Sequence, residues 1–224
     1  MLKSLISLFF PICCHVCGRS LSEGEKILCL KCISALPRTD FHVWENNDLM
    51  KKLVNLQKLQ RASAFLKFTK GEKTQRLVHK LKYENHPDIG LALGDLYGRE
   101  LRQAGYDSLV DIIIPIPLHK SKLRKRGYNQ SAQFAAGLSK ALEIPWSDSA
   151  VARKVNNPSQ THKSKTERWS SVEGIFHVKR PELILDKNIL LVDDVITTGA
   201  TIESCGMELE KYCKSISVAA IASA

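Results

Sequence analysis

A run of four apolar residues, two acids and a threonine-rich turn constrains the fold of this chain most strongly. Residues 189–201 read ILLVDDVITTGAT. The apolar run predicts a buried strand, and the turn after it predicts the start of a helix. Backbone N–H groups at a helix start bind phosphate, and acids at a strand end can accept hydrogen bonds from ribose hydroxyls. The predicted sugar-phosphate site comprises Asp193, Asp194, Thr197, Thr198, Gly199, Ala200 and Thr201.

The segments around this motif predict the fold class. Apolar runs and helical periodicity predict strands at 109–116, 150–155, 176–179 and 216–221 and helices at 131–142 and 201–213. A pair of helices split at Pro87 precedes them, and the basic end of the first, with Lys80, Lys82 and Tyr83, is interpreted as a solvated edge. Alternating strands and helices, with strands apolar on both faces, predict an α/β fold with a parallel sheet and helices on both faces.

The chain has seven cysteines, and this odd number argues against a disulfide framework. The spacing of four of them indicates a metal site. Two Cys-x-x-Cys pairs are separated by 11 residues. Two such turns complete a closed tetrahedron of thiolates, so we expect one structural zinc in a four-cysteine zinc-ribbon module. The predicted ligands are Cys14, Cys17, Cys29 and Cys32. Cys13 remains an alternative to Cys14, with His15 a more distant one, and Cys205 and Cys213 are expected to be buried thiols.

Positive charge is concentrated in two stretches. The chain has 33 Lys+Arg against 23 Asp+Glu, a net charge of +10, and residues 119–168 and 61–82 carry +8 and +6 of it. This distribution favours a partner rich in negative charge, although two solvated basic faces would give the same pattern. No apolar run reaches the roughly 18–20 residues of a membrane span. We therefore expect a soluble protein, with residues 1–14 forming a short helix that packs on the body.

The motif at residues 189–201 resembles the phosphoribosyl pyrophosphate (PRPP) motif of type I phosphoribosyltransferases. The order of parts is also informative: a zinc cluster, PIPL at 115–118, RKRGYNQ at 124–130, and then the PRPP motif. Nearly the whole chain is similar in this way to the ComF family of competence proteins, including its GntX-like members. Because members of this family are bacterial, cytoplasmic proteins, the resemblance implies a cytoplasmic protein. The resemblance implies a zinc-ribbon module (1–45), a connector (46–73) and a phosphoribosyltransferase-like domain (74–224).

The resemblance also implies roles for individual residues. Residues 117–130 correspond to the loop that holds pyrophosphate, in which Arg124 and Arg126 would grip the ligand, and residues 156–171 correspond to a catalytic lid that includes Arg168. Asp193 and Asp194 would fix the ribose of PRPP or ribose 5-phosphate, with Mg²⁺ neutralising the pyrophosphate.

Three functions remain open from the sequence. The first is a competence protein that handles single-stranded DNA in natural transformation, beside the DNA-uptake machinery, and keeps a PRPP site. The second is a phosphoribosyltransferase of nucleotide metabolism, and the third is a regulator that senses PRPP without chemistry. The basic stretches favour the first, because a transferase acting on a free base needs fewer cations. Its DNA-binding surface would include Lys120, Lys122, Arg124, Lys125, Arg126, Lys163, Lys165 and Arg168, with help from the basic stretch from Arg61 to Lys82.

Overall fold

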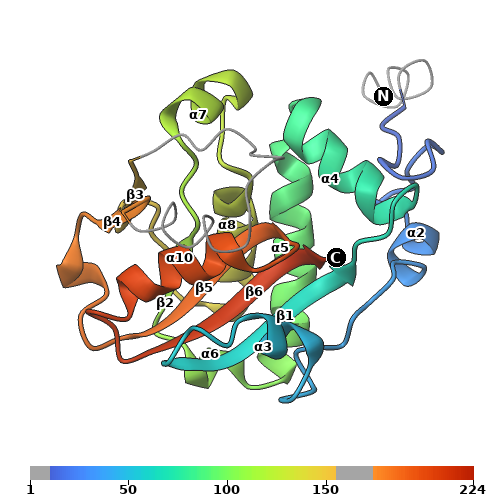
Figure 1. Cartoon of the computed structure of the whole chain (residues 1–224). Coiled ribbons are helices and arrows are strands. Elements are labelled where there is room, and N and C mark those ends of the chain that lie inside the picture. Colours follow the sequence, from blue (N-terminus) through green and yellow to red (C-terminus); the bar gives the residue numbers. More distant parts are fainter. Residues whose placement is uncertain (1–10, 155–173) are drawn as a thin grey trace.

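A four-stranded parallel sheet organises the part of the chain that the computed structural model describes, residues 11–154 and 174–224 (Figure 1). The strand order is β1-β6-β5-β2, and every neighbouring pair is parallel. Because all four strands run the same way, their carboxyl ends meet at one edge of the sheet. The strands are β1 (Leu59–Lys67), β2 (Ile112–Pro115), β5 (Asn188–Ile196) and β6 (Ser215–Ser223).

Helices cover both faces of this sheet, which confirms the predicted fold class. Leu190 and Val192 of β5 belong to one apolar core, and Ile189 and Leu191 belong to the other. Figure 1 shows α5 and α8 behind the sheet and α10 in front of it. The helices are α2 (Leu30–Ser34), α3 (Asp48–Lys52), α4 (Lys73–Tyr83), α5 (Pro87–Gln103), α6 (Tyr106–Leu109), α7 (Lys120–Arg126), α8 (Gln130–Leu142) and α10 (Ala200–Leu209), with a 3₁₀ turn at Pro181–Leu183.

Part of the predicted connector contributes a strand to the sheet. Residues 46–73, predicted to be a connector, contain α3 and β1, and β1 pairs with β6 along its length. The α/β fold therefore begins before residue 74. The sequence gives only a weak signal for a strand here, because β1 has no long apolar run. Several of its buried residues are small: Ala62, Ser63 and Ala64.

Two predicted segments have a different form in the structure. Residues 117–130, predicted to be a loop, include the short helix α7. The predicted strands near residues 150 and 176 are present as β3 (Val151–Arg153) and β4 (Phe176–Val178), but they form a separate antiparallel pair. The predicted lid at 156–171, Arg168 within it and the predicted N-terminal helix fall largely or wholly outside the described residues.

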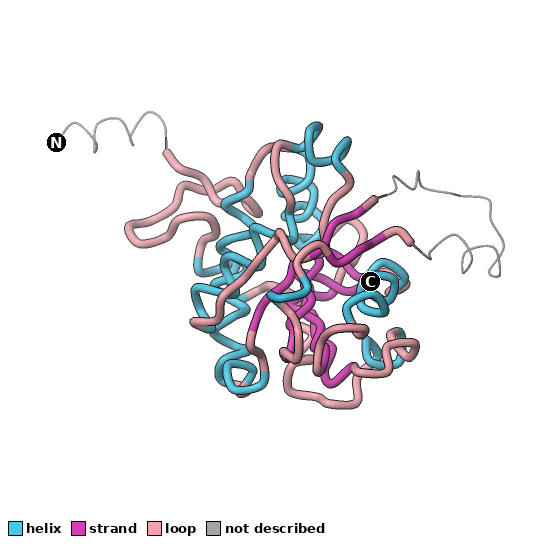
Figure 2. The backbone as a smooth tube through the Cα atoms, turned by 90° about the vertical axis from the view of Figure 1, so that its left-hand side faces the viewer, coloured by secondary structure: helices cyan, strands magenta, loops and turns pink. Residues whose placement is uncertain are grey.

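The N-terminal module packs against α4 and α5. Lys73 at the start of α4 donates a hydrogen bond from its Nζ to the carbonyl of Ala35 (3.2 Å), and Arg38 forms a salt bridge with Glu100 of α5 (3.0 Å). Figure 2 shows the module and the ends of β3 and β4 on opposite sides of the body. Among the described residues, no helix is long and apolar enough to cross a membrane.

Helices α5 and α8 pack so closely that glycine is required at their contact. A Cβ atom on Gly137 of α8 would lie 2.2 Å from the carbonyl oxygen of Leu91, and one on Gly94 of α5 would lie 2.3 Å from that of Phe134. These are backbone atoms, which cannot rotate away as a side chain can. The glycines therefore fix the distance between the two helices that cover one face of the sheet.

Replacing Gly137 by alanine is expected to lower the free energy of unfolding by about 3 kcal/mol, because overpacking here must push two helices apart. Urea unfolding followed by circular dichroism measures this change. Gly206→Ala in α10 is the matched control, since its added Cβ meets only side-chain atoms of Leu56 (2.6 Å) and should cost about 1 kcal/mol or less. Equal stability of Gly137→Ala and the wild type would contradict the packing argument.

Candidate functional site

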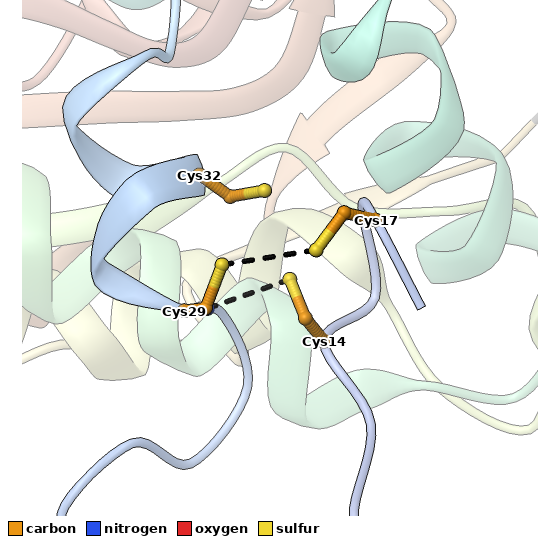
Figure 3. Close-up of side chains that lie close together, drawn as sticks. All are labelled: Cys14, Cys17, Cys29 and Cys32. Atoms are coloured by element: carbon orange, nitrogen blue, oxygen red, sulfur yellow. Dashed lines mark hydrogen bonds between the residues drawn. The ribbon is translucent and has the colours of Figure 1, made fainter. Parts of the chain in front are cut away.

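The four predicted ligand cysteines converge in the N-terminal module (Figure 3). Their sulfur atoms all lie within 4.8 Å of one another, and Cys17 Sγ is 3.8 Å from Cys29 Sγ. Cys13 is exposed and its Sγ donates a hydrogen bond to the carbonyl of Pro11, so it lies outside the set. The structure therefore brings together the donors that a closed zinc site needs, with Cys14 in preference to Cys13.

Backbone N–H groups favour the thiolate form of Cys14 and Cys29, whereas burial and the neighbouring thiols raise the pKa of Cys32 to about 12. The N–H of Cys29 donates to Cys14 Sγ at 3.4 Å. Burial raises the pKa of Cys14, but hydrogen bonds from the backbone of Cys17, Cys29 and Val16 outweigh it and lower this pKa to about 6. Cys14 is therefore held in the thiolate form, which is the form that binds metal.

The predicted acid pair lies at the carboxyl end of β5. Asp193 Oδ1 accepts hydrogen bonds from Ser131 Oγ (3.0 Å) and from the backbone N–H of Asp194 (2.8 Å). Burial, and next the adjacent Asp194 carboxylate, raise the pKa of Asp193. Two carboxyl groups this close resist double ionisation, so the pair is a natural acceptor for polar hydrogens of a ligand or for a counter-charge.

The sequence around residues 128–131 holds α8 beneath the acid pair. The side-chain oxygen of Asn129 caps the helix by accepting from the N–H of Ser131, and its Nδ2 donates to the carbonyl of Ile116 at the end of β2 (2.9 Å). Ser131 then reaches Asp193 from the first turn of α8. Asn129 therefore links the segment after β2, the start of α8 and, through Ser131, the acid pair.

A lysine that the sequence analysis interpreted as a solvated edge lies in this site. Lys82, near the end of α4, places its Nζ 2.9 Å from Asp194 Oδ1, and both side chains are mostly buried. The sequence carried only a general signal for this residue, the basic end of a helix. Nothing in the spacing indicates that α4 ends against β5, 112 positions further along the chain.

Further cations surround the acid pair. Burial, and then the charges of Arg153, Arg126 and Lys82, lower the pKa of Lys122, and Asp194 partly opposes this shift. These cations come from α7, β3 and α4, so three separate elements place positive charge around one pair of acids. Such a cluster favours a ligand that carries several negative charges.

The two arginines predicted to grip pyrophosphate have different environments in α7. Arg126 is half-buried, donates to Gln130 Oε1 (2.8 Å) and lies over the ring of Tyr83 (5.4 Å). Arg124 is exposed. Arg126 therefore belongs to the cation cluster in this conformation, whereas Arg124 faces solvent.

The threonine-rich turn after β5 has the form of an anion cradle. Thr197, Thr198, Ala200 and Thr201 are exposed and Gly199 is buried at the N-terminus of α10. Gly199 has φ +85°, and a Cβ there would meet Leu53 Cδ2 at 2.8 Å, so only glycine fits. The turn and Asp193 line one small hollow of about 30 Å³.

A larger groove adjoins the cation cluster. It has a volume of about 380 Å³ and extends between the segment after β2, α8 and β3. Trp146, Tyr128 and Leu123 contribute apolar surface to its lining, and Lys120, Arg153 and Lys179 contribute positive charge. Apolar rings beside cations are the pairing that stacks a base and holds its phosphate.

Known proteins resemble this chain in sequence. A family model described as a phosphoribosyl transferase domain matches residues 128–224. The DNA utilization protein YhgH of Escherichia coli is 29% identical over 192 residues, 84% of this chain and 80% of the relative. Competence protein ComFC of Bacillus subtilis is 26% identical over 205 residues, 92% and 80% of the two chains. Competence protein F of Haemophilus influenzae is 31% identical over 144 residues, which cover 60% of this chain and 61% of the relative.

Solved structures resemble it more distantly. A glutamine PRPP amidotransferase from Bacillus subtilis has a TM-score of 0.43 and 18% identity, covering 64% of this chain and 30% of its own length. An adenine phosphoribosyltransferase has a TM-score of 0.40 and 18% identity, and the match covers 62% of this chain and 71% of that enzyme.

The parallel sheet, the matched domain and the four-cysteine module define the class of protein: an α/β protein of the phosphoribosyltransferase type with an N-terminal zinc-ribbon-like module. Within that class, the chain is similar over most of its length to DNA utilization and competence proteins, which supports a ComF-family protein.

Proposed function

We propose that this protein acts in the bacterial cytoplasm during DNA uptake, where it handles single-stranded DNA and binds PRPP or ribose 5-phosphate at the carboxyl end of β5. The observation that carries the proposal is the acid pair Asp193–Asp194, set between a cluster of cations and an exposed turn at a helix N-terminus. This combination offers acceptors for ribose hydroxyls within reach of donors for phosphate. Names of relatives support the competence-related role.

Each part of the site has a distinct task in this proposal. The carboxylates of Asp193 and Asp194 accept hydrogen bonds from the two ribose hydroxyls, and the exposed turn at 197–201 donates N–H groups to the 5-phosphate. Lys122 and Arg126 hold the pyrophosphate with charge-assisted hydrogen bonds. Bound Mg²⁺ would neutralise part of the pyrophosphate charge. Binding alone requires no acceptor base, so the proposal does not depend on group transfer.

The N-terminal module has a structural task in the proposal. Its four thiols would hold one zinc ion, with no coordination position left for chemistry. The module contacts α4 through Lys73, and α4 carries Lys82 to Asp194. A folded module therefore helps to keep one of the site cations in place.

The DNA surface is assigned to α7 and the groove beside it. Lys120, Lys122, Arg124 and Lys125 are exposed on α7, and the groove adds Trp146 and Tyr128 as aromatic neighbours. One PRPP molecule accounts for only part of this charge. A strand that tracks α7 would place its phosphates on the lysines and a base in the groove, with little preference for sequence.

Binding of a fluorescently labelled oligothymidylate at several salt concentrations tests this assignment. If about four phosphates are neutralised, log affinity should fall against log salt with a slope near −3, because each contact on a single strand contributes roughly −0.7. Changing Lys120, Lys122 and Lys125 to glutamate should weaken binding by more than about tenfold and flatten the slope. PRPP with Mg²⁺ should compete partly, since Lys122 and Arg126 serve both ligands.

A second triple variant controls for net charge. Lys187, Lys211 and Lys214 lie near the opposite, amino-terminal edge of the sheet, and their change to glutamate alters net charge equally. This control should keep a slope near −3. No detectable binding by the wild type at low salt, or equal losses in both variants, would contradict a DNA surface on α7.

A further inference from the structure

Two histidines and an aspartate meet where the N-terminal module contacts the start of α5. His15 comes from the first Cys-x-x-Cys turn, His86 precedes the first residue of α5, and Asp88 lies in its first turn. Their potential ligand atoms all lie within 4.8 Å of one another, and the set is separate from the four cysteines. His15 Nε2 is 3.9 Å and His86 Nδ1 is 3.7 Å from the Asp88 carboxylate.

These distances are too long for hydrogen bonds and close to those of shared metal ligands. Hydrogen bonds between nitrogen and oxygen span about 2.7–3.2 Å. Two ligands on one tetrahedral ion, each about 2.1 Å from it, lie about 3.4 Å apart. The His86 side chain makes no capping hydrogen bond to α5, so helix capping does not explain its position. The three groups therefore lie near enough to share one ion, with the two imidazoles facing the two oxygens of one carboxylate.

The two imidazole rings lie side by side at the module contact. The centroids of His15 and His86 are 4.4 Å apart with an angle of 63° between the ring planes, an edge-to-face contact. Both rings are half-buried, and Asp88 is the more exposed partner. Two imidazoles from different parts of the chain and one carboxylate therefore converge where the module contacts α5.

We propose that His15, His86 and Asp88 bind a second Zn²⁺ ion, distinct from the ion of the cysteine cluster. Two imidazole nitrogens and one carboxylate oxygen suit a borderline divalent ion, and three protein ligands leave one position for water. The ion would join the module to α5, and it does not depend on what the acid pair binds. Its affinity is expected to be lower than that of the four thiolates, so it exchanges while the thiolate site stays loaded.

Titration of the zinc-loaded full chain with Co²⁺ tests this site. Co²⁺ on nitrogen and oxygen ligands gives only weak visible absorption, whereas Co²⁺ on thiolates adds an intense charge-transfer band in the near ultraviolet. We expect one equivalent of Co²⁺ to bind saturably with weak absorption alone and to be displaced by added Zn²⁺. An intense near-ultraviolet band and nothing else would mean that only the cysteine cluster takes metal, which would overturn the proposal.

Variants locate the site and control for folding. Loss of a group that only supports a metal ligand weakens metal binding about 10- to 100-fold. His86→Gln and Asp88→Asn each remove a ligand itself, so each should weaken Co²⁺ binding by at least that factor. His79→Ala is the matched control, because His79 is an exposed histidine on α4 that faces Glu84 (3.1 Å). Retention of the tightly bound zinc by each variant shows that the module is folded. Unchanged Co²⁺ affinity in both ligand variants would assign the ion to other residues.

Discussion

Replacing Cys29 by serine is expected to remove zinc from the N-terminal module and to unfold residues 11–36 together. Zinc ligation contributes roughly 10 kcal/mol or more to folding of such modules. Buried aliphatic side chains in this range are Val16, Leu28 and Leu36. Three of them contribute about 5–9 kcal/mol, whereas ordering the backbone of some two dozen residues costs several times that amount. Without the ion, the module therefore has too little buried surface to stay folded.

The α/β part should remain folded but become less stable. It keeps its sheet and the core between α5 and α8, but it loses the hydrogen bonds of Lys73 to Ala35 and of Arg38 to Ile33. Metal analysis should find no tightly bound zinc in Cys29→Ser, circular dichroism should retain the α/β signal, and proteases should cut before residue 37. Cys13→Ser is the control and should keep its metal, because Cys13 lies outside the cluster. Metal-free wild type that is fully folded would exclude a structural zinc.

Features that depend on short stretches of sequence could be predicted well. The apolar run of β5, its two acids and the turn after it occupy adjacent positions, and the structure shows a strand, an acid pair and a helix start there. The spacing of the paired cysteines likewise predicts that their sulfur atoms converge, because each Cys-x-x-Cys turn directs two sulfurs to one point. In both cases the chemistry and the local backbone form come from the same few residues.

Features that depend on contacts between distant segments could not be predicted. Lys82 reaches Asp194 only because α4 ends at the carboxyl edge of the sheet, and Arg153 approaches Asp193 only because β3 and β5 pack into the same apolar core. A lysine at the end of an amphipathic helix has the same local pattern whether it meets water or a carboxylate. Likewise, β1 is a strand because β6 pairs with it, while its own residues are too small and mixed to form a clear apolar run.

Changing both Asp193 and Asp194 to asparagine is expected to weaken PRPP binding by about a hundredfold or more. Each charge-assisted hydrogen bond contributes about 1.5–3 kcal/mol, and the variant replaces two of them with neutral ones. Calorimetry with PRPP in the presence of Mg²⁺ measures the loss. Asp107→Asn with Glu182→Gln is the matched control, because it also removes two carboxylates, both from exposed ion pairs with arginine. Its affinity for PRPP should equal that of the wild type.

Stability separates this effect from misfolding. Burial and the neighbouring carboxylate raise the pKa of Asp193 above its value in the unfolded chain, so its ionisation opposes folding increasingly as the pH rises through the folded-state pKa of about 7. Asparagine cannot ionise, and its Oδ1 can still accept from Ser131. Asp193→Asn alone should therefore unfold at a higher temperature than the wild type at pH 8, with the difference shrinking as the pH falls toward 4.

The contact of Lys82 with Asp194 predicts different stabilities for the two single variants. In the free protein it neutralises Asp194, so Asp194→Asn leaves a largely buried ammonium group without its partner, which costs stability as well as affinity. We therefore expect Asp193→Asn to lose PRPP affinity while gaining stability at pH 8, and Asp194→Asn to lose both. A wild-type affinity in the double variant would place PRPP elsewhere. If the stability instead fell equally in both single variants, the two acids would serve the fold alone. No ligand would then explain why β5 ends in two carboxylates that repel each other.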